Sequence, residues 1–282
     1  MTQSILVIGS TGKQGNAVVR ELLSEGWKVR AFTRNKHNDK LANIKDDNLE
    51  IFEGDLSNQS DLEQAMNEQF GVYCVQPIIQ NDVEQELQQG KAIIDTAVKQ
   101  NISYVVYSTA GGVNRNRTGP HFEALAKIED MLSESPLNYT IIKPSFFMDN
   151  YLRIVKVEAD NIYIPEFILP DIKFAMIPSE DNAKITAQIF KNVEEYNHQS
   201  IEIAFDELTL NEVVDTFTSV TGIKTEIKGQ FSSQTAEKSW LEEKGYVVDF
   251  EQMDQINPNR LRLNKWIENI SNNNIMLTNV CC

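Results

Sequence analysis

The chain has 282 residues, of which 41% are hydrophobic and 24% charged, a composition typical of globular proteins. Its 26 basic and 41 acidic residues give a formal net charge of −15 without a compensating Lys/Arg cluster, so direct nucleic-acid binding is not expected. No apolar run approaches the roughly 18 residues that cross a bilayer, and we expect a cytoplasmic protein without membrane contact. The three cysteines, Cys74, Cys281 and Cys282, suggest neither a disulfide framework nor a metal site.

Strand and helix patterns alternate over the first 150 residues. After a first strand at residues 5–8 and a glycine turn, Val18, Val19, Leu22 and Leu23 follow at helical spacing. Further strands are predicted at residues 28–34, 49–56, 71–77, 104–109 and 139–144, and further helices at 62–66, 90–102 and 121–135. Each right-handed crossover places a helix on one face of a parallel sheet. The alternation therefore predicts an α/β fold with a doubly wound parallel sheet of the Rossmann type.

The pattern loosens after residue 150. Three prolines interrupt residues 162–178, so we expect the chain to leave the sheet there. Residues 180–193 and 201–205 are expected as one more helix and strand that return to the main sheet. The sequence thus predicts a first domain over residues 1–150, to which 176–205 return, and a smaller α+β lobe over 151–282 that contacts a substrate or partner.

Three glycines, Gly9, Gly12 and Gly15, stand three residues apart between the first strand and its helix. This spacing permits a tight turn, close approach of the backbone to a diphosphate, and packing of the helix on the strand. The free N–H groups and the positive dipole end of the helix would then meet a pyrophosphate. Because the motif opens a leading βαβ unit, it predicts that residues 1–150 bind a dinucleotide; a merely tight turn is the alternative.

The ends of the second and third strands indicate how the adenosine half would bind. Arg34 stands where an acidic residue normally accepts a hydrogen bond from the ribose 2′-OH, and its guanidinium suits a 2′-phosphate, with Lys36 and His37 nearby. NADP(H) is therefore favoured, NAD(H) remains possible, and a solvated surface charge is the alternative. Asp55 is expected to bond the adenine amino group while Leu56 packs on the ring, although a turn or helix-cap aspartate fits equally well.

These motifs resemble those of the NmrA-like group of atypical short-chain dehydrogenases/reductases. The resemblance covers most of the chain and includes the segments GSTGKQG, VRAFTR, GDL, PHFEALAKIED and KPSFFMDN. It implies NADP(H) or NAD(H) binding, by either a redox sensor that controls a partner protein or a reductase of quinones and related small molecules. The expected cofactor-binding residues are Gly9, Thr11, Gly12, Lys13, Gln14, Gly15, Arg34, Asp55, Leu56, Gln76, Pro77, Pro144 and Phe147.

Active reductases of this superfamily use a Tyr as proton donor and a Lys four residues later. In this chain His121 falls at the Tyr position and Leu125 at the Lys position, within an apolar helical stripe. Histidine exchanges protons near neutral pH, but we expect nothing adjacent to tune His121, and a helix-start residue is the alternative. Ser108 falls where the reductases carry a substrate-orienting Ser; a turn residue is equally consistent. His121 and Ser108 are the candidate catalytic residues.

The binding half of the motif set is complete, whereas the Tyr–Lys pair is missing. We therefore predict an NADP(H)-binding regulatory protein that senses redox state through cofactor occupancy, with little turnover. The alternative is an NAD(P)H-dependent reductase of quinones or similar electron-poor substrates, because conjugation stabilises the developing oxyanion without a strong acid. The expected partners are the dinucleotide and either a small-molecule substrate or a regulated protein.

Overall fold

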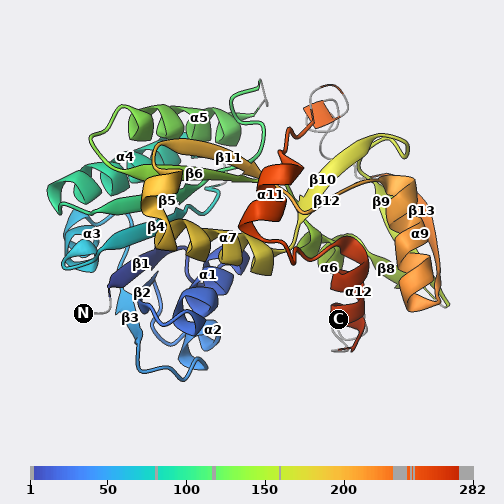
Figure 1. Ribbon diagram of the computed structural model, residues 1–282, viewed down its shortest axis with the longest axis horizontal. Coiled ribbons are helices and arrows are strands. Elements are labelled where there is room, and N and C mark those ends of the chain that lie inside the picture. The colour runs from blue at the N-terminus through green and yellow to red at the C-terminus, as the bar shows by residue number, and fades with distance from the viewer. Residues whose placement is uncertain are drawn as a thin grey trace.

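The centre of the molecule is a parallel β-sheet. A computed structural model of the chain describes residues 3–79, 82–115, 119–158, 160–230, 240, 241, 243 and 245–272. The sheet has seven strands, in the order β11 (Gln199–Ile203), β6 (Tyr139–Pro144), β5 (Tyr104–Ser108), β4 (Gly71–Val75), β1 (Ser4–Ile8), β2 (Lys28–Thr33) and β3 (Leu49–Glu53). All six neighbouring pairs run parallel (Figure 1). The doubly wound Rossmann class predicted from the sequence is confirmed.

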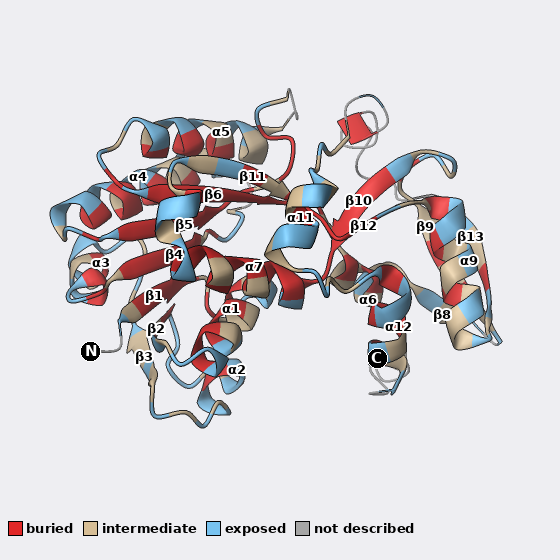
Figure 2. Ribbon diagram, viewed as in Figure 1, coloured by how far each residue is buried: buried red, intermediate tan, exposed pale blue. Residues whose placement is uncertain are grey.

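Helices cover both faces of this sheet. One face carries α1 (Lys13–Ser24), α2 (Asp39–Ala42), α7 (Ser179–Lys191) and α8 (Val193–Tyr196), and the other α3 (Gln59–Met66), α4 (Val83–Lys99) and α5 (Pro120–Ser133). Successive strand side chains point to opposite faces. In β1, Ile5 and Val7 accordingly join the core cluster of the first face, whereas Leu6 and Ile8 join that of the second. Figure 2 shows the central strands as almost entirely buried.

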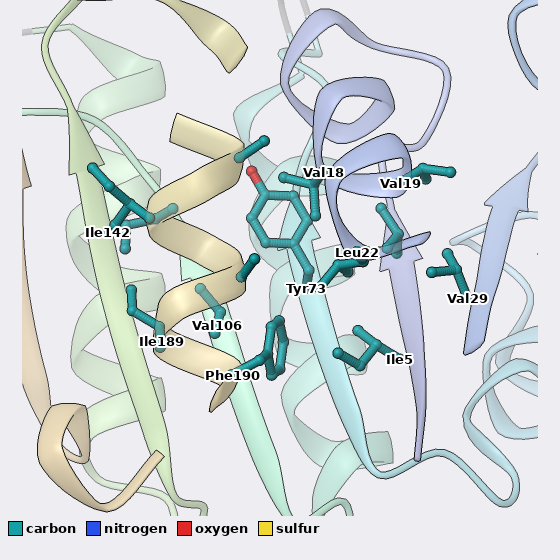
Figure 3. Packing of buried hydrophobic residues seen from close by; sticks show 14 of the residues in the cluster. Ile5, Val18, Val19, Leu22, Val29, Tyr73, Val106, Ile142, Ile189 and Phe190 are labelled. Carbon is teal, nitrogen blue, oxygen red and sulfur yellow. The ribbon is translucent and has the colours of Figure 1, made fainter. Parts of the chain in front are cut away.

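Helix α7 comes from the second half of the chain and packs beside α1. Figure 3 shows the Tyr73 ring of β4 between Val18 of α1 and the α7 helix, with Ile189 of α7 nearby. All three side chains are fully buried in one cluster. This packing fixes α1, and with it the glycine turn that precedes α1, against the sheet.

The second half of the chain also supplies the last strand of the main sheet. The helix and strand expected over residues 180–193 and 201–205 are present as α7 and β11, and β11 pairs with β6. The division into a domain over 1–150 and a lobe over 151–282 stays a prediction.

The remaining elements form two small sheets with their helices. One sheet has the order β12 (Asp206–Thr209), β10 (Lys173–Ile177), β7 (Phe146–Phe147), and the other β13 (Lys224–Gln230), β9 (Asn161–Glu166), β8 (Lys156–Glu158). The helical elements are η1 (Met148–Asn150), α6 (Tyr151–Ile154), α9 (Leu210–Thr221), α11 (Phe250–Ile256) and α12 (Leu263–Asn272). A third core cluster joins the two small sheets to η1, α6, α9 and α12, and in it Tyr151 packs against Phe217. Met253 of α11 instead belongs to the core cluster of the first face. In Figure 1 these elements occupy one side of the main sheet.

Within the described ranges, no helix is long and apolar enough to cross a membrane. The Cys74 side chain is a free, buried thiol in β4. Cys281 and Cys282 lie outside the described residues.

Candidate functional site

A cleft of about 840 Å³ opens where β1, β2, β3 and β4 end. The carboxyl ends of parallel strands are where open α/β sheets bind their ligands. The structure brings the following expected residues to this cleft: Gly9, Thr11, Gly12, Lys13, Gln14, Gly15, Arg34, Asp55, Leu56, Gln76, Pro77 and Phe147. Pro144 is not among the described lining residues; its carbonyl oxygen instead accepts a hydrogen bond of 3.0 Å from the Gly111 amide.

The glycine turn is pressed between β4 and α1. Gly9 has a φ of +81°, and a Cβ there would collide with the Val75 carbonyl oxygen of β4. A Cβ on Gly15 would collide with the Gly9 carbonyl oxygen, so the first turn of α1 packs directly on the glycine turn. The Ser10 hydroxyl donates a 2.6 Å hydrogen bond to the Phe32 carbonyl oxygen and ties the turn to β2. The turn is thus fixed by its packing on β4 and α1 and by this hydrogen bond to β2.

The amino terminus of α1 points into the cleft without a cap. Gly12 is the N-cap residue, and in the described chain no side chain bonds to the helix end and no acidic residue stands in its first turn. The first amide N–H groups of a helix otherwise need a partner, and the helix dipole makes this end favourable for an anion. Lys13 extends from the same turn and donates a 3.0 Å hydrogen bond to the Asp149 carbonyl oxygen. Burial lowers the pKa of Lys13, although the Asp149 carboxylate opposes this shift.

The adenosine side of the predicted site carries a cation and an aspartate. The Arg34 guanidinium is exposed and has no hydrogen bond or ion pair among the described residues. Asp55 accepts a 2.8 Å hydrogen bond at Oδ1 from the Ser57 amide. Asp55 therefore closes its own turn, and since it also lines the cleft, its contact with an adenine stays a prediction.

The Gln76 side chain holds the wall of the cleft together. Its Nε2 donates a 3.0 Å hydrogen bond to the Glu86 carbonyl oxygen of α4, and its Oε1 accepts one from the Tyr107 hydroxyl of β5. The side chain is only 8% exposed. Gln76 thus joins α4 to the sheet, and its amide is already committed to protein partners.

Ser108 lies beneath the cleft rather than in it. The residue is 2% exposed, and its hydroxyl donates a 2.9 Å hydrogen bond to Gln14 Oε1. The Tyr73 hydroxyl approaches the same oxygen at 3.5 Å. Burial raises the pKa of Tyr73 far above its usual value, while the neighbouring Asn182 and Ser108 side chains oppose that rise. Ser108 therefore supports a lining residue, Gln14, from below.

His121 has a partner that the sequence did not reveal. Its Nδ1 lies 2.7 Å from Glu86 Oε1, and Glu86 is fully buried in the first turn of α4. The expectation that no adjacent group is positioned against His121 was wrong, because Glu86 is 35 residues away in sequence but directly beside it. Leu125, at the position of the missing Lys, is 4% exposed. The described lining of the cleft includes neither His121 nor Leu125.

The chemistry of the described lining is that of an anion-binding cleft. Its titratable residues are Lys13, Arg34 and Asp55, all at the turn or at the ends of β2 and β3. Apolar side chains also line the cleft, among them Ile78, which is 64% exposed, and Phe147. The arrangement can bind a long ligand that carries both phosphate groups and planar rings.

Comparisons with known proteins identify the family of the chain. A model of the NmrA-like family matches residues 1–268. An NmrA-like family domain-containing protein from Dictyostelium discoideum is 26% identical over 243 residues, which cover 79% of each chain.

Solved structures share the fold at lower identity. The crystal structure of NmrA, a negative transcriptional regulator, in complex with NADP has a TM-score of 0.83 at 15% identity and covers 98% of each chain. An NADPH-dependent quinone oxidoreductase from Escherichia coli has a TM-score of 0.74 at 17% identity, over 96% of this chain and 100% of that one. At such identities the likeness establishes the fold alone.

Proposed function

This chain belongs to the NmrA-like family, and on that premise we propose that it binds NADP(H) in the cleft and acts as a redox sensor with little turnover. The observation that carries the proposal is the amino terminus of α1, which has no side-chain cap and opens into a cleft lined by Arg34, whose guanidinium has no hydrogen bond or ion pair within the described part of the chain. The solved NmrA–NADP complex, which shares this fold, supports it. A cytoplasmic location stays a prediction.

The residues present fit the dinucleotide. The amides at the start of α1 and the glycine turn would hold the pyrophosphate, Arg34 the 2′-phosphate, and Asp55 with Leu56 the adenine. NAD(H) would lack the contact with Arg34 and bind more weakly. When bound, the nicotinamide supplies hydride-transfer chemistry.

Little turnover follows from the position of the acid–base groups. Reduction of a simple carbonyl needs a proton donor within hydrogen-bonding reach of the substrate oxygen. His121 is directed at Glu86, Ser108 donates to Gln14, and Leu125 replaces the Lys. Occupancy of the cleft by NADP⁺ or NADPH is then what a regulated partner protein would respond to.

Reduction of a quinone or similar electron-poor substrate is the second candidate. Its support is the apolar part of the lining, with the exposed Ile78 and the half-buried Phe147, which suits a planar ring. Conjugation in the substrate would replace the missing acid. The NADPH-dependent quinone oxidoreductase of the same fold is consistent with this reading.

Two measurements test the proposal. In a thermal melt, NADPH or NADP⁺ at a hundred times its Kd should add about 2.7 kcal/mol of stability; an unchanged melting midpoint would refute both candidates. NADPH oxidation is then followed with a panel of quinones for the purified protein and for Arg34→Glu. Absence of sustained turnover agrees with the sensor, whereas turnover that is lost in Arg34→Glu would replace the sensor with the reductase.

A further inference from the structure

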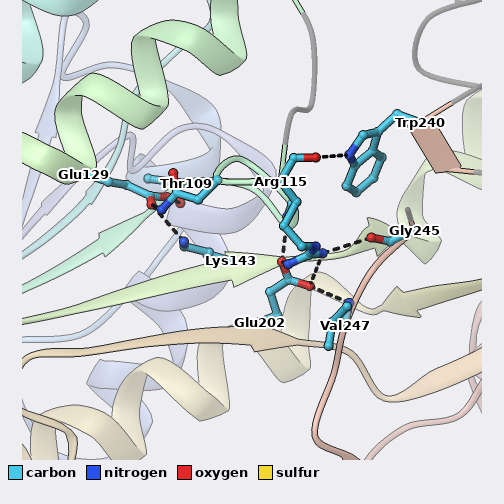
Figure 4. Close-up of polar contacts among 10 residues, drawn as sticks. Thr109, Arg115, Glu129, Lys143, Glu202, Trp240, Gly245 and Val247 are labelled. Atoms are coloured by element: carbon cyan, nitrogen blue, oxygen red, sulfur yellow. Dashed lines mark hydrogen bonds and ion pairs between the residues drawn. The ribbon is translucent and has the colours of Figure 1, made fainter. Parts of the chain in front are cut away.

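The loop that follows β5, residues 109–115, is anchored on its inner side by a buried ion pair. Glu129 of α5 lies 2.8 Å from Lys143 Nζ of β6, and both residues are less than 9% exposed. Glu129 also accepts hydrogen bonds of 2.6 Å from the Thr109 hydroxyl and 2.8 Å from the Asn114 side-chain amide. Figure 4 shows this cluster beside the loop. One carboxylate therefore holds both ends of the loop to the sheet and to α5.

A second carboxylate, Glu202 of β11, holds the outer side of the same loop. Its Oε1 accepts a 2.6 Å hydrogen bond from the Gly112 amide and pairs with the Arg115 guanidinium at 2.5 Å. Its Oε2 accepts bonds of 3.0 Å from Arg115 and 2.7 Å from the Val247 amide, and Arg115 also donates to the Gly245 carbonyl oxygen at 2.9 Å (Figure 4). Glu202 thus joins the loop to a segment more than 120 residues further along the chain.

Aromatic rings of that later segment cover the loop. The Trp240 ring lies so close to Gly112 that a Cβ there would collide with it, and Tyr246 blocks a Cβ on Gly111 in the same way. Trp240 Nε1 donates a 3.1 Å hydrogen bond to the Arg115 carbonyl oxygen. We call Trp240 with residues 245–247 the covering segment. This packing requires glycine at both loop positions, because a Cβ on Gly112 or Gly111 would collide with the ring above it.

The loop is also connected to the cleft. It begins directly after Ser108, whose hydroxyl donates to Gln14, and Gln14 stands in the first turn of α1 and lines the cleft. A ligand at the amino terminus of α1 therefore contacts a residue that is one hydrogen bond away from the loop. If a ligand binds more tightly to the conformation in which Ser108 is bonded to Gln14, it increases the population of that conformation and stabilises the loop contacts that belong to it.

We propose that the covering segment is a latch on residues 109–115, fastened by Glu202, and that a dinucleotide in the cleft strengthens the latch through Gln14 and Ser108. The inference rests on the proposed function and names the element that would report occupancy to a partner. Coupling between two sites is reciprocal. Release of the latch must weaken dinucleotide binding by the factor by which the dinucleotide strengthens the latch.

Hydrogen exchange measured by mass spectrometry, with and without saturating NADP⁺, tests this in the whole protein. In wild type, NADP⁺ should slow exchange at residues 109–115 and 245–249 as well as at the glycine turn. Glu202→Gln keeps the shape of the side chain but removes its charge, and should speed exchange in both segments without ligand. It should also raise the Kd for NADP⁺ at least about 5-fold, the lower end of typical coupling between sites. Trp240→Phe, which removes the bond to Arg115, should act in the same direction.

The matched control is Glu25→Gln, which removes an ion pair between α1 and α7 (Lys191 Nζ to Glu25 Oε2, 2.6 Å). It should change neither exchange in the two segments nor the Kd. The latch is refuted if Glu202→Gln and Trp240→Phe leave exchange at residues 245–249 unchanged. The coupling is refuted if both variants free the segment yet keep the wild-type Kd. If NADP⁺ does not slow hydrogen exchange even at residues 9–15, the proposed function itself is refuted. Hydrogen exchange of the ligand-free variants then still decides whether Glu202 fastens the covering segment.

Discussion

Replacement of Arg34 by Ala should separate the two nicotinamide dinucleotides. The guanidinium has no partner among the described residues, so its loss leaves no buried charge behind and should change stability by less than about 0.5 kcal/mol. A hydrogen bond to a charged group contributes about 1.5–3 kcal/mol. Because Arg34 is exposed and screened by solvent, we expect the lower end, which is roughly a tenfold loss of NADP⁺ affinity. NAD⁺ has no 2′-phosphate, so its affinity should fall less than about twofold in Arg34→Ala.

Isothermal titration with NADP⁺ and NAD⁺ at one fixed ionic strength gives both dissociation constants. The control is Lys28→Ala, which removes the same charge from the opposite end of β2, outside the described lining of the cleft. Equal loss of affinity for both dinucleotides, or an equal loss in the control, would mean that Arg34 acts through the overall charge of the protein and not through a 2′-phosphate. No loss at all would remove Arg34 from the site.

Three further outcomes follow from the packing. Gly15→Ala should destabilise the protein by about 1–3 kcal/mol, seen by calorimetry, because its Cβ would collide with the Gly9 carbonyl oxygen. Gly12→Ala, whose Cβ would lie 3.2 Å from the same oxygen, should destabilise the protein less and should also bind NADP⁺ more weakly; equal destabilisation by the two variants would contradict this. Lys143→Met leaves the Glu129 carboxylate buried and unpaired, so urea unfolding should show a loss of about 3–5 kcal/mol; a loss below about 1 kcal/mol would indicate that Glu129 needs no countercharge. Burial raises the pKa of Cys74 to about 12, so its thiol stays protonated at pH 8 and should react with iodoacetamide only after unfolding, whereas rapid labelling of the native protein would refute its burial.

The sequence predicted what depends on local spacing. The glycine turn, its position between a strand and a helix, and the polar residues at the ends of β2 and β3 all follow from short segments read in order. Because parallel strands end at one edge, these segments had to converge, and residues as far apart as Gly9, Arg34 and Asp55 line one cleft. The fold class was predictable for the same reason.

Contacts between distant segments were not predictable. Glu86 beside His121 brings together the first turns of two helices, and no local pattern pairs them. The Gln76 side chain was expected at the cofactor, but its amide is used by α4 and β5. Pro144 ends a strand like the others, yet β11 pairs beside it and its carbonyl oxygen accepts a hydrogen bond from Gly111, so it contacts the loop after β5 and is not among the described lining residues of the cleft.

The Ser108 hydroxyl can orient a substrate or connect the cleft to residues 109–115, but it cannot do both at once. A substrate-orienting Ser must direct its hydroxyl proton to the substrate oxygen, whereas Ser108 gives its single proton to Gln14 across 94 residues of sequence. To orient a substrate, Ser108 would have to break the bond that connects the cleft to residues 109–115. With Ser108 bonded in this way and Leu125 in place of the Lys, the proposed response to the dinucleotide is a change in residues 109–115 and the covering segment, and the assay with quinones decides between this response and turnover.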